Sequence, residues 1–253
     1  MKVNRIRLIT RADDAGSNES ANSAIRDAVN SGLVRNVSFM TTCDALEEAV
    51  GLFRDDEEVC CGVHLTMNAE WNRVKWGPVA PIDQVRSLID AEGFFHPTPE
   101  AMRQAGAKVD ELFIEMAAQL ERLRKAGITV RYADEHMVFG RVFDGFENRF
   151  DLWCKQERLV NHRKFTRRLP HPTVSIAPLI DLVGTLNLAE PGVYTWVTHP
   201  AYDSDEMRQL VHAGLEEGRI ARERDADARL MTSEELKRAL LERDIALIRY
   251  DEA

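Results

Sequence analysis

The most constraining feature of this 253-residue chain is a pair of adjacent aspartates, Asp13 and Asp14, directly after a short apolar run. The run from Ile6 to Thr10 predicts a buried strand, and Gly16 with the following Ser and Asn predicts a turn and a helix start. Neighbouring strand side chains point to opposite sides, so both carboxylates can face one cleft only if the chain turns here. Ligands of α/β folds bind at such strand ends. The alternative is a turn that merely caps the next helix.

Helical and strand patterns alternate along the rest of the chain. The predicted helices are Glu19–Asn30, Ala45–Phe53, Asp110–Ala126, Ser204–Glu216 and Ser233–Glu242, and the predicted strands are Asn36–Thr41, Glu58–Leu65, Ile128–Tyr132, Val193–Thr198 and Ala246–Tyr250. A further strand and helix are expected over Val174–Ile180 and Asp181–Leu186. This alternation implies parallel strands joined by right-handed crossovers, and therefore an α/β sheet or barrel. Because no repeat or linker-like segment interrupts it, we expect one domain over residues 1–253.

Composition narrows the classes of function. Lys and Arg number 33 and Asp and Glu 42, and the resulting net charge of −9 argues against a nucleic-acid partner. The one basic stretch, Arg158 to Arg168, is better explained by a solvated helix face or an oligomer contact. The four cysteines form no Cys-x-x-Cys pair, which indicates reduced thiols. Neither a signal peptide nor a membrane-spanning run is evident, so we expect a cytoplasmic protein with no membrane partner.

The regular pattern lapses between Asn68 and Pro99. This segment holds Trp71 and Trp76 among several glycines and prolines. Long loops inside a compact domain are usually functional, and indole rings suit the flat apolar faces of sugars. Equally, the two tryptophans could simply attach an irregular loop to the core. The sequence does not choose between these interpretations.

Three of the seven histidines, His64, His136 and His199, also stand where predicted strands end. Parallel strands bring their carboxyl ends to one face, so these side chains should converge with the aspartate pair. One Asp and two His make a three-ligand catalytic metal site, a spare carboxylate can accept a proton, and a further His can protonate a leaving group. This chemistry is hydrolysis of an amide or ester. The mixed nitrogen and oxygen ligands fit zinc, magnesium or manganese.

The other histidines lack this placement at a strand end. His96 falls in a proline-rich loop, His162 and His171 near the basic stretch, and His212 within a predicted helix. We therefore expect these four to be surface or packing residues.

Four motifs carry the constellation: Ala12-Asp13-Asp14-Ala15-Gly16, Gly62-Val63-His64-Leu65-Thr66, Asp134-Glu135-His136 and Thr198-His199-Pro200. In order and spacing they resemble the YdjC-like carbohydrate deacetylase family, and the similarity runs over almost the whole chain. The resemblance implies a single-domain distorted (β/α) barrel of the polysaccharide-deacetylase type. It also implies removal of acetyl groups from N-acetylated sugars, typically short chitin-derived oligosaccharides, with a divalent metal ion, Mg or Zn.

Carried over by position, the family pattern assigns a role to each strand-end residue. Asp14, His64 and His136 would bind the metal, Asp13 would be the general base, and His199 would be the acid opposite it.

The chain departs from the family pattern at Ala15, Glu135, Val138, Thr195 and Ala201, where the family usually has Phe, Ser, His, Glu and Gly. The five strand-end residues are unchanged, which favours metal-dependent hydrolysis, and the departures lie at the rim of the site, where they bear on the choice of sugar. Glu135 in particular could add a carboxylate that selects a cationic or differently substituted sugar.

Three alternatives compete with a sugar deacetylase that acts on a small-molecule substrate. The same site could hydrolyse another amide or ester, or the chain could be a carbohydrate-binding protein that has lost catalysis. A structural α/β domain with coincidental histidines is the third. If the chain forms a homodimer, Phe94, Phe95 and the basic stretch are its candidate contact surfaces.

Overall fold

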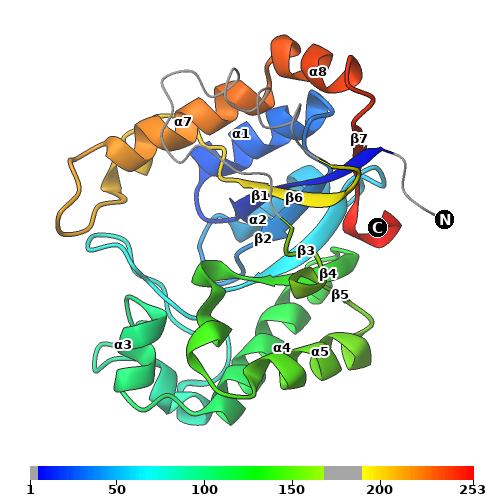
Figure 1. Cartoon of the computed structure of the whole chain (residues 1–253). Coiled ribbons are helices and arrows are strands. Elements are labelled where there is room, and N and C mark those ends of the chain that lie inside the picture. The colour runs from blue at the N-terminus through cyan, green and yellow to red at the C-terminus, as the bar shows by residue number, and fades with distance from the viewer. Residues whose placement is uncertain (1–4, 168–189) are drawn as a thin grey trace.

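The computed structural model describes residues 5–167 and 190–253, and its centre is a sheet of seven parallel strands. The strands are β1 (Ile6–Ala15), β2 (Asn36–Phe39), β3 (Cys60–Leu65), β4 (Val130–Glu135), β5 (Val160–Asn161), β6 (Gly192–Thr198) and β7 (Ala246–Ile248). Their order is β5-β4-β3-β2-β1-β6, and β7 pairs with the first half of β1, beside the part that pairs with β2. The sheet curls between helices into a distorted (β/α) barrel (Figure 1).

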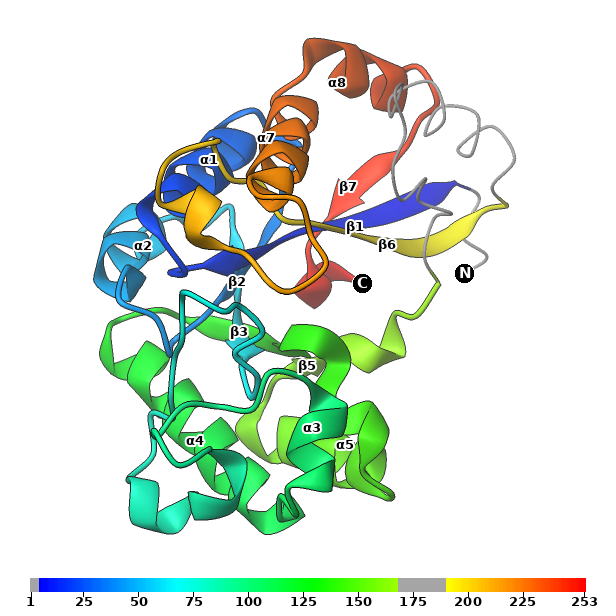
Figure 2. The same cartoon turned by 90° about the vertical axis from the view of Figure 1, so that its left-hand side faces the viewer.

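Helices cover the outer face of this sheet. They are α1 (Glu19–Asn30), α2 (Leu46–Phe53), α3 (Pro99–Gln104), α4 (Val109–Lys125), α5 (Phe146–Glu157), α7 (Arg219–Met231) and α8 (Glu234–Leu241). Figure 2 shows α1, α7 and α8 at one end of the curled sheet and α3, α4 and α5 at the other. None of these helices is both long and apolar enough to cross a membrane, a finding limited to residues 5–167 and 190–253.

Strand alternation divides the residues of the sheet between two faces. On the outer face Leu8, Val63 and Ala133 join the large core under the helices. On the inner face a small apolar cluster fills the end of the barrel where the strands begin, with Ile9 and Tyr132 among its members. Two residues further along β1 and β4, the inner face carries Arg11 and Asp134. The carboxyl ends of the strands are therefore where charged side chains meet.

Gly62 makes room for the largest ring of the inner face. A Cβ atom at Gly62 would lie 2.4 Å from the Tyr132 ring, so only glycine fits beneath it. The Tyr132 hydroxyl lies 2.7 Å from the Ser38 Oγ, and the Tyr132 ring packs 4.4 Å from the ring of Tyr250. This filled base makes the opposite end of the barrel the one open to a ligand.

Several predicted elements end elsewhere or do not form. β1 continues to Ala15, so the aspartate pair lies within the strand rather than after it. The predicted helix Ser204–Glu216 was wrong: only a 3-10 turn, Met207–Gln209, forms there, and α7 starts later. Gly214 and Gly218 both have positive φ, which interrupts a helix between these two elements. The expected strand Val174–Ile180 and helix Asp181–Leu186 lie outside the described residues.

The basic stretch is not a helix face. Up to Arg167 it contains β5 and a 3-10 turn, His162–Lys164, and several of its basic side chains have partners. Lys164 lies 3.3 Å from Asp151, and Arg167 stacks on the Tyr194 ring. Phe95, a proposed contact residue, is 1% exposed and belongs to the core, so it cannot serve a dimer surface.

Candidate active site

A left-handed residue turns both aspartates of β1 into the barrel. Asp14 has φ 69°, and the pairing of β1 with β2 shifts register between Ala12 and Ala15. This bulge breaks the two-residue period, so Asp14 faces the same side as Asp13 although the two are neighbours. The turn expected from the sequence is therefore present inside the strand. Asn18 caps α1 directly afterwards, with its side chain accepting a hydrogen bond from the Ala21 N–H.

Three donor atoms from β1, β3 and the turn after β4 converge on one point. Asp14 Oδ1 lies 3.4 Å from His64 Nε2 and 3.7 Å from His136 Nδ1, and the two imidazole nitrogens are 3.2 Å apart. Ligands bound at about 2.1 Å in a tetrahedral arrangement are themselves about 3.4 Å apart. The three atoms are spaced as the ligands of one small ion, and all three side chains are buried.

The second polar atom of each of these side chains is already engaged. Asp134 lies 2.5 Å from His64 Nδ1, and Glu70 lies 3.1 Å from His136 Nε2. Arg224 binds Asp14 Oδ2 at 2.7 Å, whereas Asp14 Oδ1 is buried and has no hydrogen-bond partner. Outer partners of this kind orient the ligands of metal ions in proteins. The donor set therefore fits a divalent cation.

The net charge of the side chains around the donor set also favours a bound cation. These side chains provide four carboxylates and two guanidiniums, from Asp13, Asp14, Glu70, Asp134, Arg11 and Arg224. Although burial opposes it, the negative charge raises the pKa of His136 to about 9, chiefly through Glu70, and raises that of His64 through Asp134. Without a metal, the excess negative charge thus attracts protons to both imidazoles.

Asp13 and His199 lie beside this donor set. Arg11 donates two hydrogen bonds to Asp13, at 2.6 and 2.8 Å, and also lies 3.3 Å from Asp134 inside the barrel. His199 Nε2 is 3.9 Å from Asp13 Oδ2, and the His199 backbone N–H donates to Asp227 of α7. Loss of hydration lowers the pKa of His199 against the pull of Asp14. A carboxylate and an imidazole therefore share one side of the site.

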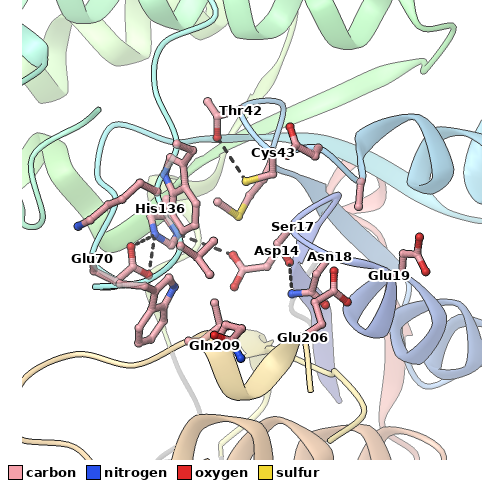
Figure 3. Close-up of a pocket in the computed structure, with 18 of the residues that line it drawn as sticks. Asp14, Ser17, Asn18, Glu19, Thr42, Cys43, Glu70, His136, Glu206 and Gln209 are labelled. Atoms are coloured by element: carbon pink, nitrogen blue, oxygen red, sulfur yellow. Dashed lines mark hydrogen bonds and ion pairs between the residues drawn. The ribbon is translucent and has the colours of Figure 1, made fainter. Parts of the chain in front are cut away.

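Two cavities meet at the donor set. The larger, about 660 Å³, is lined by Asp13, His64 and His199, and the smaller, about 380 Å³, is drawn in Figure 3. Five residues line both: Asp14, Glu70, Trp71, His136 and Arg224. A substrate held over the donor atoms can thus extend to either side of them.

Trp71 and Trp76 attach the irregular loop to the core and also lie at a cavity. Both are buried and belong to the core, and the Trp76 indole N–H donates to the Asn68 carbonyl. Both also line the smaller cavity, and Trp71 stacks on His212 with ring centroids 5.7 Å apart. His212 lies in a loop at the larger cavity, so its predicted place within a helix was wrong.

Glu135 lines the larger cavity, but its carboxylate is not exposed there. Its side chain is fully buried on the outer face of β4, where it accepts two hydrogen bonds from Arg163 and one from the Gly140 N–H. His162 lies 3.2 Å from the same carboxylate, so this histidine is a packing residue as expected. Of the other departures from the family pattern, Val138 lines the larger cavity, whereas Thr195 and Ala201 line neither cavity.

Four residues that position the site were not assigned a role from the sequence: Arg11, Glu70, Asp134 and Arg224. Strand alternation could have found two of them, because Arg11 shares a face with Asp13, and Asp134 with His136. Glu70 comes from the irregular loop and Arg224 from a helix that the pattern misplaced. No local signal pointed to either.

Relatives of known name match the chain nearly end to end. The "Carbohydrate deacetylase" of Thermoanaerobacter pseudethanolicus is 23% identical and covers 96% of this chain and 97% of its own length. The protein of the same name from Brevibacillus brevis is 25% identical, with 98% of this chain and 99% of that protein covered.

Solved structures share the fold. A putative cellobiose-phosphate cleavage protein from Enterococcus faecalis superposes with a TM-score of 0.82 at 20% identity, covering 98% of both chains. A Streptococcus mutans CE4 esterase gives a TM-score of 0.51 at 11% identity, covering 98% of this chain and 87% of that one. The model of the family described as YdjC-like protein matches residues 7–174, which include both aspartates, His64 and His136. The chain belongs to the YdjC-like family.

Proposed function

We propose that this chain is a divalent-metal-dependent hydrolase that removes acetyl groups from N-acetylated sugars or short oligosaccharides such as diacetylchitobiose. The observation that carries the proposal is the convergence of three donor atoms beside Asp13 and His199. One of the three, Asp14 Oδ1, is buried and has no hydrogen-bond partner. Carbohydrate deacetylases of similar sequence over nearly the whole chain support the substrate class.

Asp14, His64 and His136 would hold the ion. When bound, a divalent metal supplies Lewis-acid polarisation of the acetyl carbonyl and lowers the pKa of a water molecule. Two imidazole nitrogens favour zinc, and the carboxylate is compatible with magnesium. We therefore propose Mg or Zn as the cofactor.

Asp13 would remove the proton of the attacking water. Its carboxylate is 3% exposed and held by two hydrogen bonds from Arg11, so it can rotate little and keeps its lone pairs in a fixed direction. His199 would donate a proton to the sugar nitrogen as the amide bond breaks. Its side chain is 43% exposed, so it can exchange protons with solvent between turnovers.

The cavities accommodate a sugar on either side of the ion. Trp71 lies at their junction and offers an apolar surface of the kind that contacts sugar rings. The lining of the smaller cavity combines indole rings with hydrogen-bonding groups such as Asn18 and Gln209 (Figure 3). This combination suits a pyranose, which has apolar C–H faces and hydroxyl groups at its edge.

The proposal is tested by metal analysis of the purified chain together with acetate release from N,N'-diacetylchitobiose, before and after chelation and re-metallation. We expect release that disappears with the chelator and returns with a divalent ion. His64→Ala should lose both the bound metal and the acetate release. Metal bound by the wild type but retained by His64→Ala would contradict the ligand assignment.

The same assay separates the alternatives. Bound metal without acetate release, but with turnover of simple amides or esters, would identify a hydrolase of another substrate, which the exchange to Val138 in the larger cavity favours. Sugar binding without turnover on any substrate would identify a binding protein on this fold.

A further inference from the structure

Arg224 is a cation built into the junction of the two cavities. It lies on α7, its Nη1 is 2.7 Å from Asp14 Oδ2, and its side chain is 13% exposed. The backbone of Arg224 is fixed as well, because its carbonyl accepts a hydrogen bond from the Ala201 N–H. Three residues later on the same face of α7, Asp227 accepts the backbone N–H of His199. The helix thus contacts both sides of the candidate active site.

This contact decides how Asp14 can bind an ion. A carboxylate binds a metal through one oxygen or through both, and Arg224 occupies Oδ2, whereas Oδ1 faces the two imidazoles and has no hydrogen-bond partner. Asp14 also has a left-handed backbone, so its side-chain direction depends on contacts made further out. We propose that Arg224 is a positioning residue that makes Asp14 a single-oxygen ligand. The inference rests on the metal site of the proposed function.

Charge and position predict opposite effects when Arg224 is removed. A guanidinium next to a ligand repels a metal cation, so by Coulomb's law alone its loss would tighten metal binding. A guanidinium that orients the ligand instead strengthens binding, and loss of such an outer partner typically weakens it about 10- to 100-fold. The sign of the change in affinity therefore distinguishes the two roles.

The experiment compares Arg224→Met, Arg224→Lys and the wild-type full chain. The dissociation constants of Zn²⁺ and Co²⁺ are measured on chelator-treated protein, and the visible spectrum of the Co²⁺ form reports the coordination number. We expect Arg224→Met to bind both ions about 10- to 100-fold more weakly, and its Co²⁺ absorption to weaken because a second carboxylate oxygen can now bind. Arg224→Lys, which can still donate one hydrogen bond, should stay closer to the wild type.

Arg222→Met is the matched control. Arg222 lies on the same helix, is 53% exposed and pairs with Glu216 at the surface, so its loss should leave both constants unchanged. Tighter or unchanged metal binding by Arg224→Met, with an unaltered Co²⁺ spectrum, would overturn the positioning role. If Arg224→Met does not fold, Arg224→Ala takes its place, and the same results support or overturn the role. A wild type that binds neither ion would instead refute the proposed metal site.

Discussion

Asp134 and Glu135, consecutive residues of β4, belong to two buried clusters of opposite character. Asp134 faces the interior of the barrel, where carboxylates outnumber guanidiniums and Asp14 Oδ1 has no hydrogen-bond partner. Glu135 faces the helices, where Arg163, His162 and the Gly140 N–H engage its carboxylate. Buried charge is costly unless it is paired. In the cluster around Glu135 the charges are matched, and this cluster is a structural element. In the cluster around Asp134 negative charge is in excess and unmatched, which fits a further cation.

The largest effect should come from the unmatched cluster. Asp13→Asn keeps the shape of the side chain but removes the base, and general-base catalysis typically contributes about 10²- to 10⁴-fold. We expect acetate release to fall by this factor while bound metal, measured by elemental analysis, stays equal to that of the wild type. Loss of the metal as well would show that Asp13 is a ligand and would redraw the division between the roles of the two aspartates.

The matched cluster should respond in the opposite way. Glu135→Gln leaves Arg163 and His162 facing a neutral group, and breaking a buried ion pair from one side costs about 3–5 kcal/mol. Denaturant unfolding should show this loss in the free energy of unfolding, with acetate release per folded molecule unchanged.

Glu47→Gln, at an exposed position of α2, is the control for Glu135→Gln and should leave stability unchanged. A Glu135→Gln variant with normal stability and an altered substrate preference would break the comparison, since it would return Glu135 to the substrate site.

A smaller effect is expected at the base of the barrel. The Tyr250 hydroxyl accepts a hydrogen bond of 3.1 Å from Arg11, the residue that holds Asp13. Tyr250→Phe removes only this bond, worth about 1 kcal/mol, so kcat should fall about 3- to 10-fold with KM unchanged. Tyr202→Phe, which removes a hydroxyl bonded to Asp27 on the surface, is the control. Equal kcat for Tyr250→Phe and wild type would show that Arg11 holds Asp13 without this support.

Glu115 of α4 tests the cost of buried charge at a carboxylate that pairs with no cation among residues 5–167 and 190–253. It accepts hydrogen bonds from the backbone of Val79 and Ala80 and from Gln119, and burial raises its pKa. The folded state therefore holds the proton to a higher pH than the unfolded state does, so the contribution of Glu115 to stability falls as pH rises above about 4.5.

The measurement for Glu115 is the difference in free energy of unfolding between wild type and Glu115→Gln at pH 4 to 7. We expect the wild type to lose stability relative to the variant over this interval, and the effect to be the smallest of the four. A difference that grows in favour of the wild type as pH rises would mean that the three hydrogen bonds outweigh the loss of hydration.

Periodicity predicted most of the fold and the parts of the site that lie on strands. The helix Glu19–Asn30 was predicted at its observed bounds, and His64 and His136 were expected at one face because parallel strands bring their ends together. The same two-residue period, applied to Asp134-Glu135-His136, would have placed Glu135 on the opposite face from its neighbours. Its expected role in substrate choice overlooked this alternation.

What the sequence could not predict depends on contacts between distant segments. The bulge at Asp14 interrupts the strand period, and no residue pattern within β1 requires it. Glu70 and Arg224 reach the site because the irregular loop and α7 close over the strand ends. α7 itself was misplaced because the residues from Ser204 onward have helical spacing but are interrupted by glycines.

The ion pair between Asp14 and Arg224 also has a consequence for how the chain folds. Its two members lie on β1 and α7, and β2 to β6 lie between them in the sequence. Contacts of such long range form late because closing a long loop costs entropy. A folding intermediate in which β1 to β4 are paired but α7 is undocked would contain all three donor atoms and would still bind the ion weakly. The rate at which metal affinity appears during refolding would therefore report the docking of one helix.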